Sequence, residues 1–172
     1  MARVSEELEV REARIAELDV VLCILEDAAL WMVRKEVEGW TPASFSRTRI
    51  ADLIERGEIY VAFLNGRVVG TFALQWSDEE TWGTLPDDAG YLHGLAVLRK
   101  LAGMGLGREL LGWTENRVSL SGRKYLRLDC VAANKALNEY YLRAGFGYRG
   151  RTLVRGIEVS LFEKQVGVWG AG

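Results

Sequence analysis

The sequence is poor in the residues that most often build metal centres and disulfide frameworks. Its 172 residues include one histidine, His93, and two cysteines, Cys23 and Cys130, which lie far apart along the chain. Zinc sites and disulfide scaffolds need several such residues at characteristic spacings. The usual zinc motifs and a disulfide framework are therefore excluded, and we expect no metal.

No sign of charge dominates either, because 22 Lys and Arg residues stand against 24 Asp and Glu residues, for a formal net charge of −2. Such a chain has no general attraction for nucleic acid or for an anionic membrane. Residues 1–7 lack the apolar segment of a signal peptide, and no run approaches the roughly 18 apolar residues that span a bilayer. We predict no nucleic-acid partner, no membrane partner and a cytoplasmic location.

The composition that remains is ordinary for a soluble globular protein, with 49% hydrophobic and 27% charged residues. A chain of this length fits one domain with a real core. We place that domain at residues 1–166 and interpret the glycine-rich residues 167–172 as a flexible tail.

Apolar periodicity predicts alternating strands and helices. Asn65-Gly66 predicts a two-residue hairpin turn between its flanking strands, and the polar residues 77–89 are expected to form a loop. The sum is a mixed sheet with helices on its faces. The expected helices are residues 16–35, 43–56, 107–120 and 134–144, and the expected strands are residues 8–14, 58–64, 67–76, 90–97, 125–131, 146–154 and 157–164.

Three glycines, Gly103, Gly105 and Gly107, alternate immediately before a predicted helix. Glycine lets backbone approach a ligand closely, and the unpaired N–H groups of a helix start favour phosphate. From the turn alone, a phosphate site and a flexible loop are about equally supported. A dinucleotide-binding fold also competes, because Asp129 follows about 20 residues downstream. That fingerprint needs a glycine where this chain has Arg108, and only one strand-helix-strand unit is evident.

Two motifs decide between these interpretations. Leu95-Ala96-Val97 followed by Ala102-Gly103-Met104-Gly105-Leu106-Gly107-Arg108 resembles the acyl-CoA-binding motif of the GNAT acyltransferase superfamily. Asn134, Tyr141 and Gly145-Phe146 resemble that superfamily's downstream pattern, in which an asparagine opens a helix and a tyrosine lies four residues before Gly-Phe. The two motifs occur in the right order, and the resemblance covers nearly the whole chain.

The resemblance implies an α/β fold with a GNAT-like mixed, largely antiparallel twisted sheet of six or seven strands flanked by about four helices. It implies an N-acetyltransferase that moves an acetyl group from acetyl-CoA to a primary amine of a small molecule or peptide by direct attack on the thioester. A homodimer stays open. The alternatives are a non-catalytic CoA-binding module of the same fold and, less favoured, an NAD-type oxidoreductase.

The resemblance also implies roles for particular residues. The strand backbone at Leu95 and Val97 is expected to bind the acyl-pantetheine arm, and Asn134 to contact the coenzyme. The chain departs from the family at Ala102, where Arg or Gln is common, so the backbone amides of residues 103–108 are expected to bind the pyrophosphate. Arg99 or Lys100 is the nearest alternative source of charge.

Acyl transfer to an amine needs a proton acceptor, because a lysine-like amine has a pKa of about 10.4. His93 is the natural base, and Tyr91 shares its face of the strand and suits relaying. The run from Tyr91 to Val97 is similar to the same strand of the arylalkylamine N-acetyltransferases, where histidines relay the substrate's proton. A half-buried histidine satisfied by a carbonyl group is an equally supported alternative.

Collapse of the tetrahedral intermediate releases a thiolate, so a positioned tyrosine hydroxyl is a plausible proton donor. Asn134, Asn138 and Tyr141 form a polar stripe at helical spacing, which predicts that Tyr141 faces the chemistry and Tyr140 the core. The resemblance selects Tyr141 as well. For the acceptor it points to the loop between the first two helices and to the last strands, where this chain has Glu36, Glu38, Trp40, Tyr148 and Arg149, although a solvated loop is the more favoured interpretation.

Overall fold

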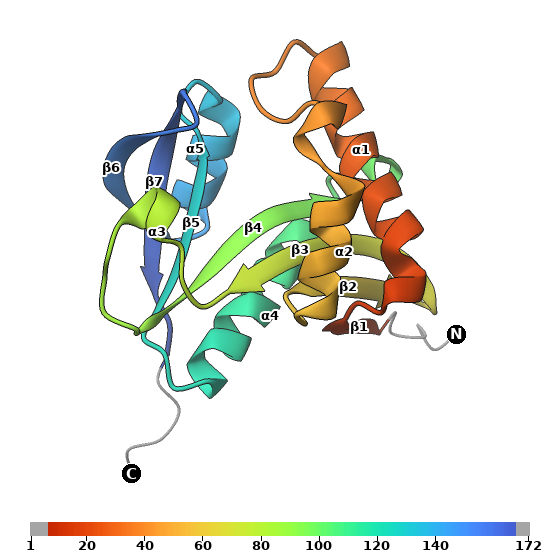
Figure 1. The fold of residues 1–172 in the computed structure, drawn as a ribbon, viewed down its shortest axis with the longest axis horizontal. Coiled ribbons are helices and arrows are strands. Elements are labelled where there is room, and N and C mark those ends of the chain that lie inside the picture. Colours follow the sequence, from red (N-terminus) through yellow and green to blue (C-terminus); the bar gives the residue numbers. More distant parts are fainter. Residues whose placement is uncertain (1–6, 168–172) are drawn as a thin grey trace.

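Seven strands form one sheet in the order β1-β2-β3-β4-β5-β7-β6 (Figure 1). The computed structural model describes residues 7–167, so the predicted tail lies outside the described residues except for Gly167. The strands are β1 (Leu8–Glu12), β2 (Ile59–Leu64), β3 (Arg67–Gln75), β4 (Ala89–Val97), β5 (Tyr125–Val131), β6 (Gly147–Val154) and β7 (Ile157–Gln165).

Every neighbouring pair of strands is antiparallel except β4 and β5, which are parallel. The predicted mixed, largely antiparallel sheet is confirmed, and a doubly wound parallel fold of the dinucleotide-binding type does not match this topology. The helices are α1 (Leu18–Arg34), α2 (Arg47–Glu55), α3 (Glu79–Trp82), α4 (Leu106–Leu120) and α5 (Lys135–Arg143), and the 3-10 turns are η1 (Ile15–Glu17), η2 (Pro42–Ser44) and η3 (Arg99–Leu101).

Two hydrophobic clusters hold the helices on opposite faces of the sheet. One packs α1 and α2 against β2 and β3, with Val21, Ile24 and Val61 almost fully buried. The other packs α4 and α5 against β5 and β7, with Leu111 and Phe162 at its centre. Figure 1 shows α1 and α2 in front of the middle strands and α4 behind them. Burial of these apolar side chains is the main force that fixes the layers.

Local sequence explains most element boundaries. Asn65 and Gly66 both have positive φ angles, 51° and 75°, as the predicted hairpin turn between β2 and β3 requires. Two predictions were wrong in detail. The helix expected from residue 43 begins at Arg47, because Pro42 forms a separate 3-10 turn and the Ser46 side chain caps α2 by accepting from the Arg49 N–H. The expected loop of residues 77–89 contains α3, which Asp78 caps.

Within the part of the chain that the structure describes, no helix combines the length and hydrophobicity that crossing a membrane requires.

Candidate active site

The site begins where the one parallel pair of strands comes apart. The pairing of β4 with β5 runs from Ala89 opposite Tyr125 to Leu92 opposite Leu128 and ends there. His93 and Asp129 are the next residues in this register, one on each side of the split. Beyond them the carboxyl end of β4 diverges from β5 (Figure 1).

A β-bulge accompanies this split. Between the pairs Thr71–Ala96 and Ala73–His93, β4 has two residues, Gly94 and Leu95, opposite one on β3. Gly94 has a φ of 60°, a conformation that glycine adopts without steric penalty. Beyond Leu92, the edge of β4 that faces away from β3 therefore has no partner strand and is open to a ligand.

A cavity of about 670 Å³ occupies this opening. It extends from the C-terminal end of α1, along β4 and β5, to the start of α4 and one side of α5. Of the catalytic and coenzyme-binding residues predicted from the sequence, only Met104 and Tyr91 do not line it. Those that do are His93, Leu95, Ala96, Val97, Ala102, Gly103, Gly105, Leu106, Gly107, Arg108, Asn134 and Tyr141.

At one end the cavity meets the amino terminus of α4. The N-cap residue is Gly105, whose φ of 84° is left-handed and which has no side chain to cap the helix. A Cβ atom at Gly103 or Gly105 would meet nothing within 4 Å, so the space beside the turn is open. Unpaired N–H groups and the positive end of the helix dipole therefore face the cavity, an arrangement suited to phosphate.

Arg99 supplies a positive charge beside this turn. Its guanidinium lies 3.9 Å from the centre of the Trp31 ring, and its backbone N–H donates to Asp27 Oδ2 at 3.3 Å. Among the described residues, its Nε atom is buried and has no hydrogen-bond partner. Arg99 lines the cavity, whereas the neighbouring Lys100 is exposed and does not.

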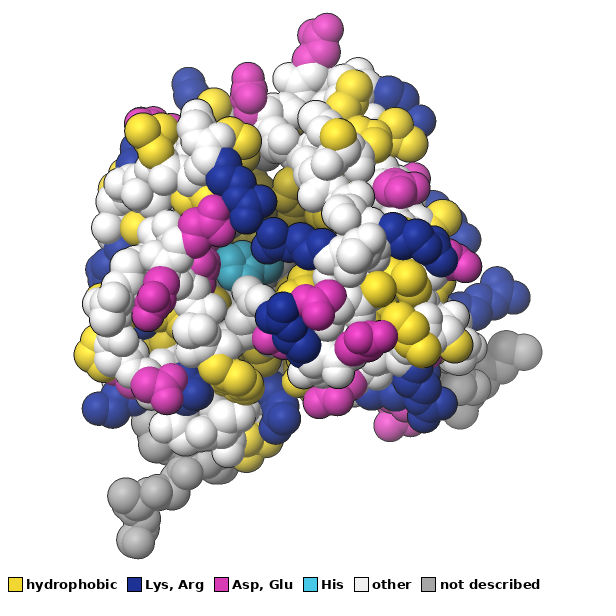
Figure 2. Space-filling model, in the orientation of Figure 1, with side chains coloured by type: hydrophobic (Ala, Val, Ile, Leu, Met, Phe, Trp, Pro, Cys, Tyr) yellow, Lys and Arg dark blue, Asp and Glu magenta, His cyan; other side chains and the backbone are white. Residues whose placement is uncertain are grey.

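His93 lies between two carboxylates at the other end of the cavity. Its Nε2 atom is 3.2 Å from Asp78 Oδ2, and its Nδ1 atom is 3.8 Å from Asp129 Oδ1. Figure 2 shows the single histidine, in cyan, at the bottom of a hollow with acidic and basic side chains around it. Asp78 is also fixed from its other side, because its Oδ1 atom accepts from the Thr81 N–H of α3 at 3.2 Å.

These neighbours set the proton affinities. Burial lowers the pKa of His93, but pairing with Asp78 and the negative charge of Asp129 outweigh it, and the pKa is raised above 6.5. For Asp129, burial raises the pKa above its ordinary value despite the nearby histidine. For Asp78, burial acts upward but pairing with His93 prevails and lowers the pKa. The three side chains are thus one coupled charged group.

The same three residues also bring donor atoms within 4.8 Å of one another. However, the two carboxylates face different nitrogens of the imidazole ring. The two ring nitrogens of an imidazole point in different directions, so an ion on one nitrogen would draw in the carboxylate that now faces the other. The arrangement fits a proton carrier held between two anions better than a chelating set.

Comparison with known proteins identifies the family. A model of the acetyltransferase (GNAT) family matches residues 25–146. The chain belongs to this family. YesJ of Bacillus subtilis, an uncharacterized N-acetyltransferase, is 34% identical over 122 residues, which are 68% of this chain and 66% of that relative.

Solved GNAT structures share the fold over nearly the full length. An acetyltransferase of the GNAT family from Listeria monocytogenes has a TM-score of 0.81 and 25% identity, covering 96% of this chain and 99% of that one. The PaiA N-acetyltransferase of Thermoplasma acidophilum, crystallised with coenzyme A, has a TM-score of 0.74 at 16% identity and covers 92% and 99% of the two chains. This second likeness is one of fold alone.

The two adjacent tyrosines of α5, Tyr140 and Tyr141, both line the cavity. Tyr141 is the more deeply buried, at 8% exposure, and packs against Phe146 and Phe162. The hydroxyl of Tyr140 instead lies against the start of α4, about 3.0 Å from where a Cβ of Gly107 would be. Tyr141 lines the cavity, but the expectation that Tyr140 faces the core alone was wrong, since Tyr140 lines the cavity as well.

Asn134 joins two walls of the cavity. Its Oδ1 atom accepts from the Leu137 N–H at 3.1 Å and so caps α5, as predicted, while its Nδ2 atom donates to the Glu38 carbonyl at 3.1 Å. The loop after α1 is thereby attached to the start of α5. The predicted contact of Asn134 with the coenzyme stays a prediction.

Tyr91 shares a face of β4 with His93 but takes part in a different network. Its hydroxyl accepts from Arg127 at 2.8 Å, and Arg127 also donates to Glu163 at 2.8 Å. Tyr91 is buried and borders a smaller cavity of about 200 Å³ beneath α3. Because Arg127 lies on β5, this network holds β4 against β5. A part for Tyr91 in a proton relay stays a prediction.

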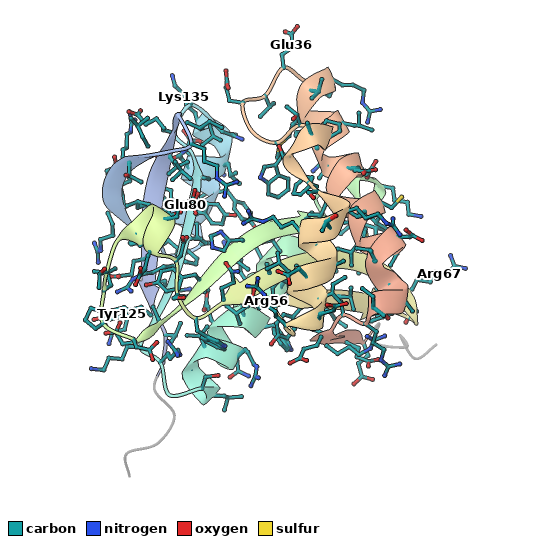
Figure 3. The ribbon with its side chains drawn as sticks, viewed as in Figure 1. Glu36, Arg56, Arg67, Glu80, Tyr125 and Lys135 are labelled. Atoms are coloured by element: carbon teal, nitrogen blue, oxygen red, sulfur yellow. The ribbon has the colours of Figure 1, made fainter. Side chains whose placement is uncertain are left out.

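Only some of the expected acceptor residues line the cavity. Glu38 and Trp40 line the cavity, whereas Tyr148 and Arg149 of β6 do not. Glu36 is exposed at the tip of the loop after α1 and points away from the cavity (Figure 3).

Sequence reasoning gave no part in the site to Trp31 and Asp129, which line the cavity, or to Asp78, which lines the smaller one. The alternation of β5 did place Asp129 on the opposite face to Leu128 and Cys130, and its position next to His93 follows only once β4 and β5 are known to pair in parallel. Asp78 lies in a segment expected to be loop, and no periodic signal marks it.

Proposed function

We propose that this protein transfers an acetyl group from acetyl-CoA to a primary amine. The observation that carries the proposal is the cavity itself, which connects a phosphate-binding helix start to a histidine–carboxylate group across an unpaired strand edge. Membership of the GNAT family and the complexes of its relatives with coenzyme A support it.

The donor binds along the long axis of the cavity. The pyrophosphate lies at the turn of residues 103–108, held by the N–H groups that Gly105 leaves free, and Arg99 supplies the side-chain charge that Ala102 lacks. The pantetheine arm follows the open edge of β4 at Leu95 and Val97. This path brings the thioester toward the split, where His93, Asp129 and Tyr141 line the walls.

His93 takes a proton from the acceptor amine, and Asp78 positions it. With Nε2 turned toward the Asp78 carboxylate, the ring proton is favoured on that nitrogen, which leaves the Nδ1 lone pair free to act as base. The neutral amine then attacks the thioester carbonyl directly. Cys130 is unsuited to an acyl-enzyme route, because burial and the charge of Asp129 raise the pKa of its thiol to about 12.

Tyr141 stabilises the departing sulfur. Burial raises the pKa of its hydroxyl far above the ordinary value, with smaller effects from Cys130 and Tyr140. Complete proton transfer to a thiolate of pKa about 8.5 would then be uphill. Tyr141 therefore acts mainly by donating a hydrogen bond to the sulfur as negative charge develops there.

Two measurements test the proposal. Saturation with acetyl-CoA at about 100 times Kd adds about 2.7 kcal/mol to the free energy of unfolding, which thermal melting detects. Acceptor-dependent release of CoA thiol is then measured on a panel of primary amines. A thermal shift with acetyl-CoA but no release on any amine would favour a non-catalytic CoA-binding module, and a shift with NAD alone would overturn donor and activity together.

A further inference from the structure

The carboxylate of Asp129 is the one acidic group at the strand split that the fold leaves without a hydrogen-bond donor. No hydrogen bond to its side chain occurs within residues 7–167, and its only close ionic neighbour there is His93 Nδ1 at 3.8 Å. Its side chain is 20% exposed, and that exposure opens into the cavity. A largely buried carboxylate in this state is stabilised by a cationic partner, because desolvation without pairing is costly and here raises its pKa.

The distance between Asp129 and His93 leaves room for a nitrogen atom that contacts both. At 3.8 Å, Asp129 Oδ1 and His93 Nδ1 are too far apart to share a hydrogen bond. They are close enough, however, for one nitrogen placed between them to reach both at about 2.8–3.0 Å. An alkylammonium group carries several N–H donors on one nitrogen, so it can meet the carboxylate and the imidazole lone pair together.

We infer that Asp129 is the binding site for the ammonium group of the acceptor, and that the acceptor is a primary alkylamine which arrives as a cation. The inference rests on the proposed function. Asp129 binds the charged nitrogen beside the thioester, and His93 Nδ1 accepts one of its protons. The amine lone pair then forms the C–N bond, the C–S bond breaks, and the sulfur takes the second proton. The proton on His93 passes to solvent, so each turnover yields amide, CoA thiol and one H⁺.

The same charge selects between amine classes. A cationic nitrogen gains an ion pair with Asp129, whereas an aromatic amine, which is neutral at pH 7, gains only a neutral contact. The ammonium also offsets the Asp129 charge that His93 experiences, which favours the neutral imidazole needed for proton transfer. Arg49 of α2 is the basic group whose charge opposes that of the carboxylates at His93.

The test compares steady-state kinetics of Asp129→Asn and wild type on two acceptors, a primary alkylamine and a primary aromatic amine. Each variant is assayed on the plateau of its own pH profile. Asp129→Asn is expected to raise KM for the alkylamine about tenfold or more, as loss of a charge-assisted contact predicts. KM for the aromatic amine and for acetyl-CoA should change by less than about twofold. Glu36→Gln removes one acidic charge that points away from the cavity, and is the matched control.

Three outcomes would overturn the inference. One is an equal rise in KM for both amines, and another is no rise for either. The third is loss of activity with EDTA and recovery with Zn²⁺ or Mn²⁺, which would assign Asp78, His93 and Asp129 to a metal. If Asp129→Asn does not fold, as judged by thermal melting, Asp129→Ser gives the same comparison. Absence of acetyl transfer by wild type to every amine would instead contradict the proposed function.

Discussion

At the scale of single residues, the site consists of a few polar side chains set into apolar walls, and each has a position that its neighbours enforce. Asp78 is bound to α3 on one side and faces His93 on the other. Arg99 is stacked on Trp31. Tyr141 is surrounded by aromatic rings. Because each group is held before substrate arrives, replacing one should change a particular kinetic parameter and leave the fold intact.

Tyr141→Phe should lower kcat about ten- to a hundredfold, because it removes one hydrogen bond to a developing charge. KM for acetyl-CoA should change little, since the ring and its packing remain. Tyr148→Phe, on the exposed side of β6, is the control and should leave kcat unchanged. Retention of full kcat by Tyr141→Phe, with a loss in Tyr140→Phe, would assign the role to Tyr140.

Arg99→Ala should raise KM for acetyl-CoA about tenfold, because the variant loses a charge-assisted contact to phosphate. Lys100→Ala removes the same charge at the next position, outside the cavity, and should have little effect. Acetyl-pantetheine, which lacks the pyrophosphate, separates the causes: both variants should use it as well as wild type does. A defect of Arg99→Ala toward both donors would show that Arg99 shapes the cavity and does not bind phosphate.

The pH dependence follows from the raised pKa of His93. The groups that face it are Asp78 before α3, Asp129 on β5 and, with opposite sign, Arg49 on α2. The base must be neutral, so kcat/KM should rise with pH, along an acidic limb whose midpoint lies above pH 6.5. The stability of the fold depends on pH in the opposite sense. The contribution of the charged His93 to the free energy of unfolding is present below the ordinary pKa of histidine and is lost as pH rises through the raised pKa of His93.

Two variants check this assignment. In Asp78→Asn the pairing that raises the pKa is lost, so the limb should move to lower pH. In His93→Gln it should disappear. Persistence of the limb at its original position in His93→Gln would identify another base.

At the scale of elements, the start of α4 depends on a backbone conformation that favours glycine, and it is the proposed phosphate site. Gly105 has a left-handed φ of 84°, so Gly105→Ala should cost roughly 1–2 kcal/mol of stability and weaken acetyl-CoA binding as the turn distorts. Gly112 lies in the middle of the same helix, exposed and with open space around its Cβ position. Gly112→Ala should therefore stabilise the protein by about 0.5–1 kcal/mol and leave binding unchanged. Urea unfolding and titration with acetyl-CoA measure both effects, and equal stability of the two variants would contradict the argument.

The elements themselves were largely predictable, because apolar periodicity and turn chemistry are local signals. The strand boundaries around Asn65-Gly66 and the cap of α5 at Asn134 needed no tertiary information. Where prediction failed, a long-range contact decided the outcome. Tyr140 and Tyr141 could not be separated by helical spacing, since both line the cavity. The importance of Asp78 comes only from its contact with His93 of the neighbouring strand.

At the scale of the whole molecule, the glycine turn, the strand split and the histidine lie along one continuous cavity although their residues span much of the chain. The loop after α1 and the start of α5 close over it through the Asn134–Glu38 contact. Arg155, in the turn between β6 and β7, donates from its Nε atom to Glu80 Oε1 of α3 at 2.9 Å. The site is thus enclosed by segments that only the complete fold brings together.

The short parallel pairing of β4 with β5 has a mechanical consequence. Within the described residues, four ladder pairs join β4 to β5, so the seam between the antiparallel halves β1–β4 and β5–β7 is short, although α4 packs across it. On the proposed path acetyl-CoA spans that seam, so it should stabilise the contact between the halves. Hydrogen exchange followed residue by residue should accordingly slow most at the amides of residues 89–97 and 125–131 when acetyl-CoA binds, more than in the outer hairpins. Uniform slowing across all seven strands would mean that the halves never separate.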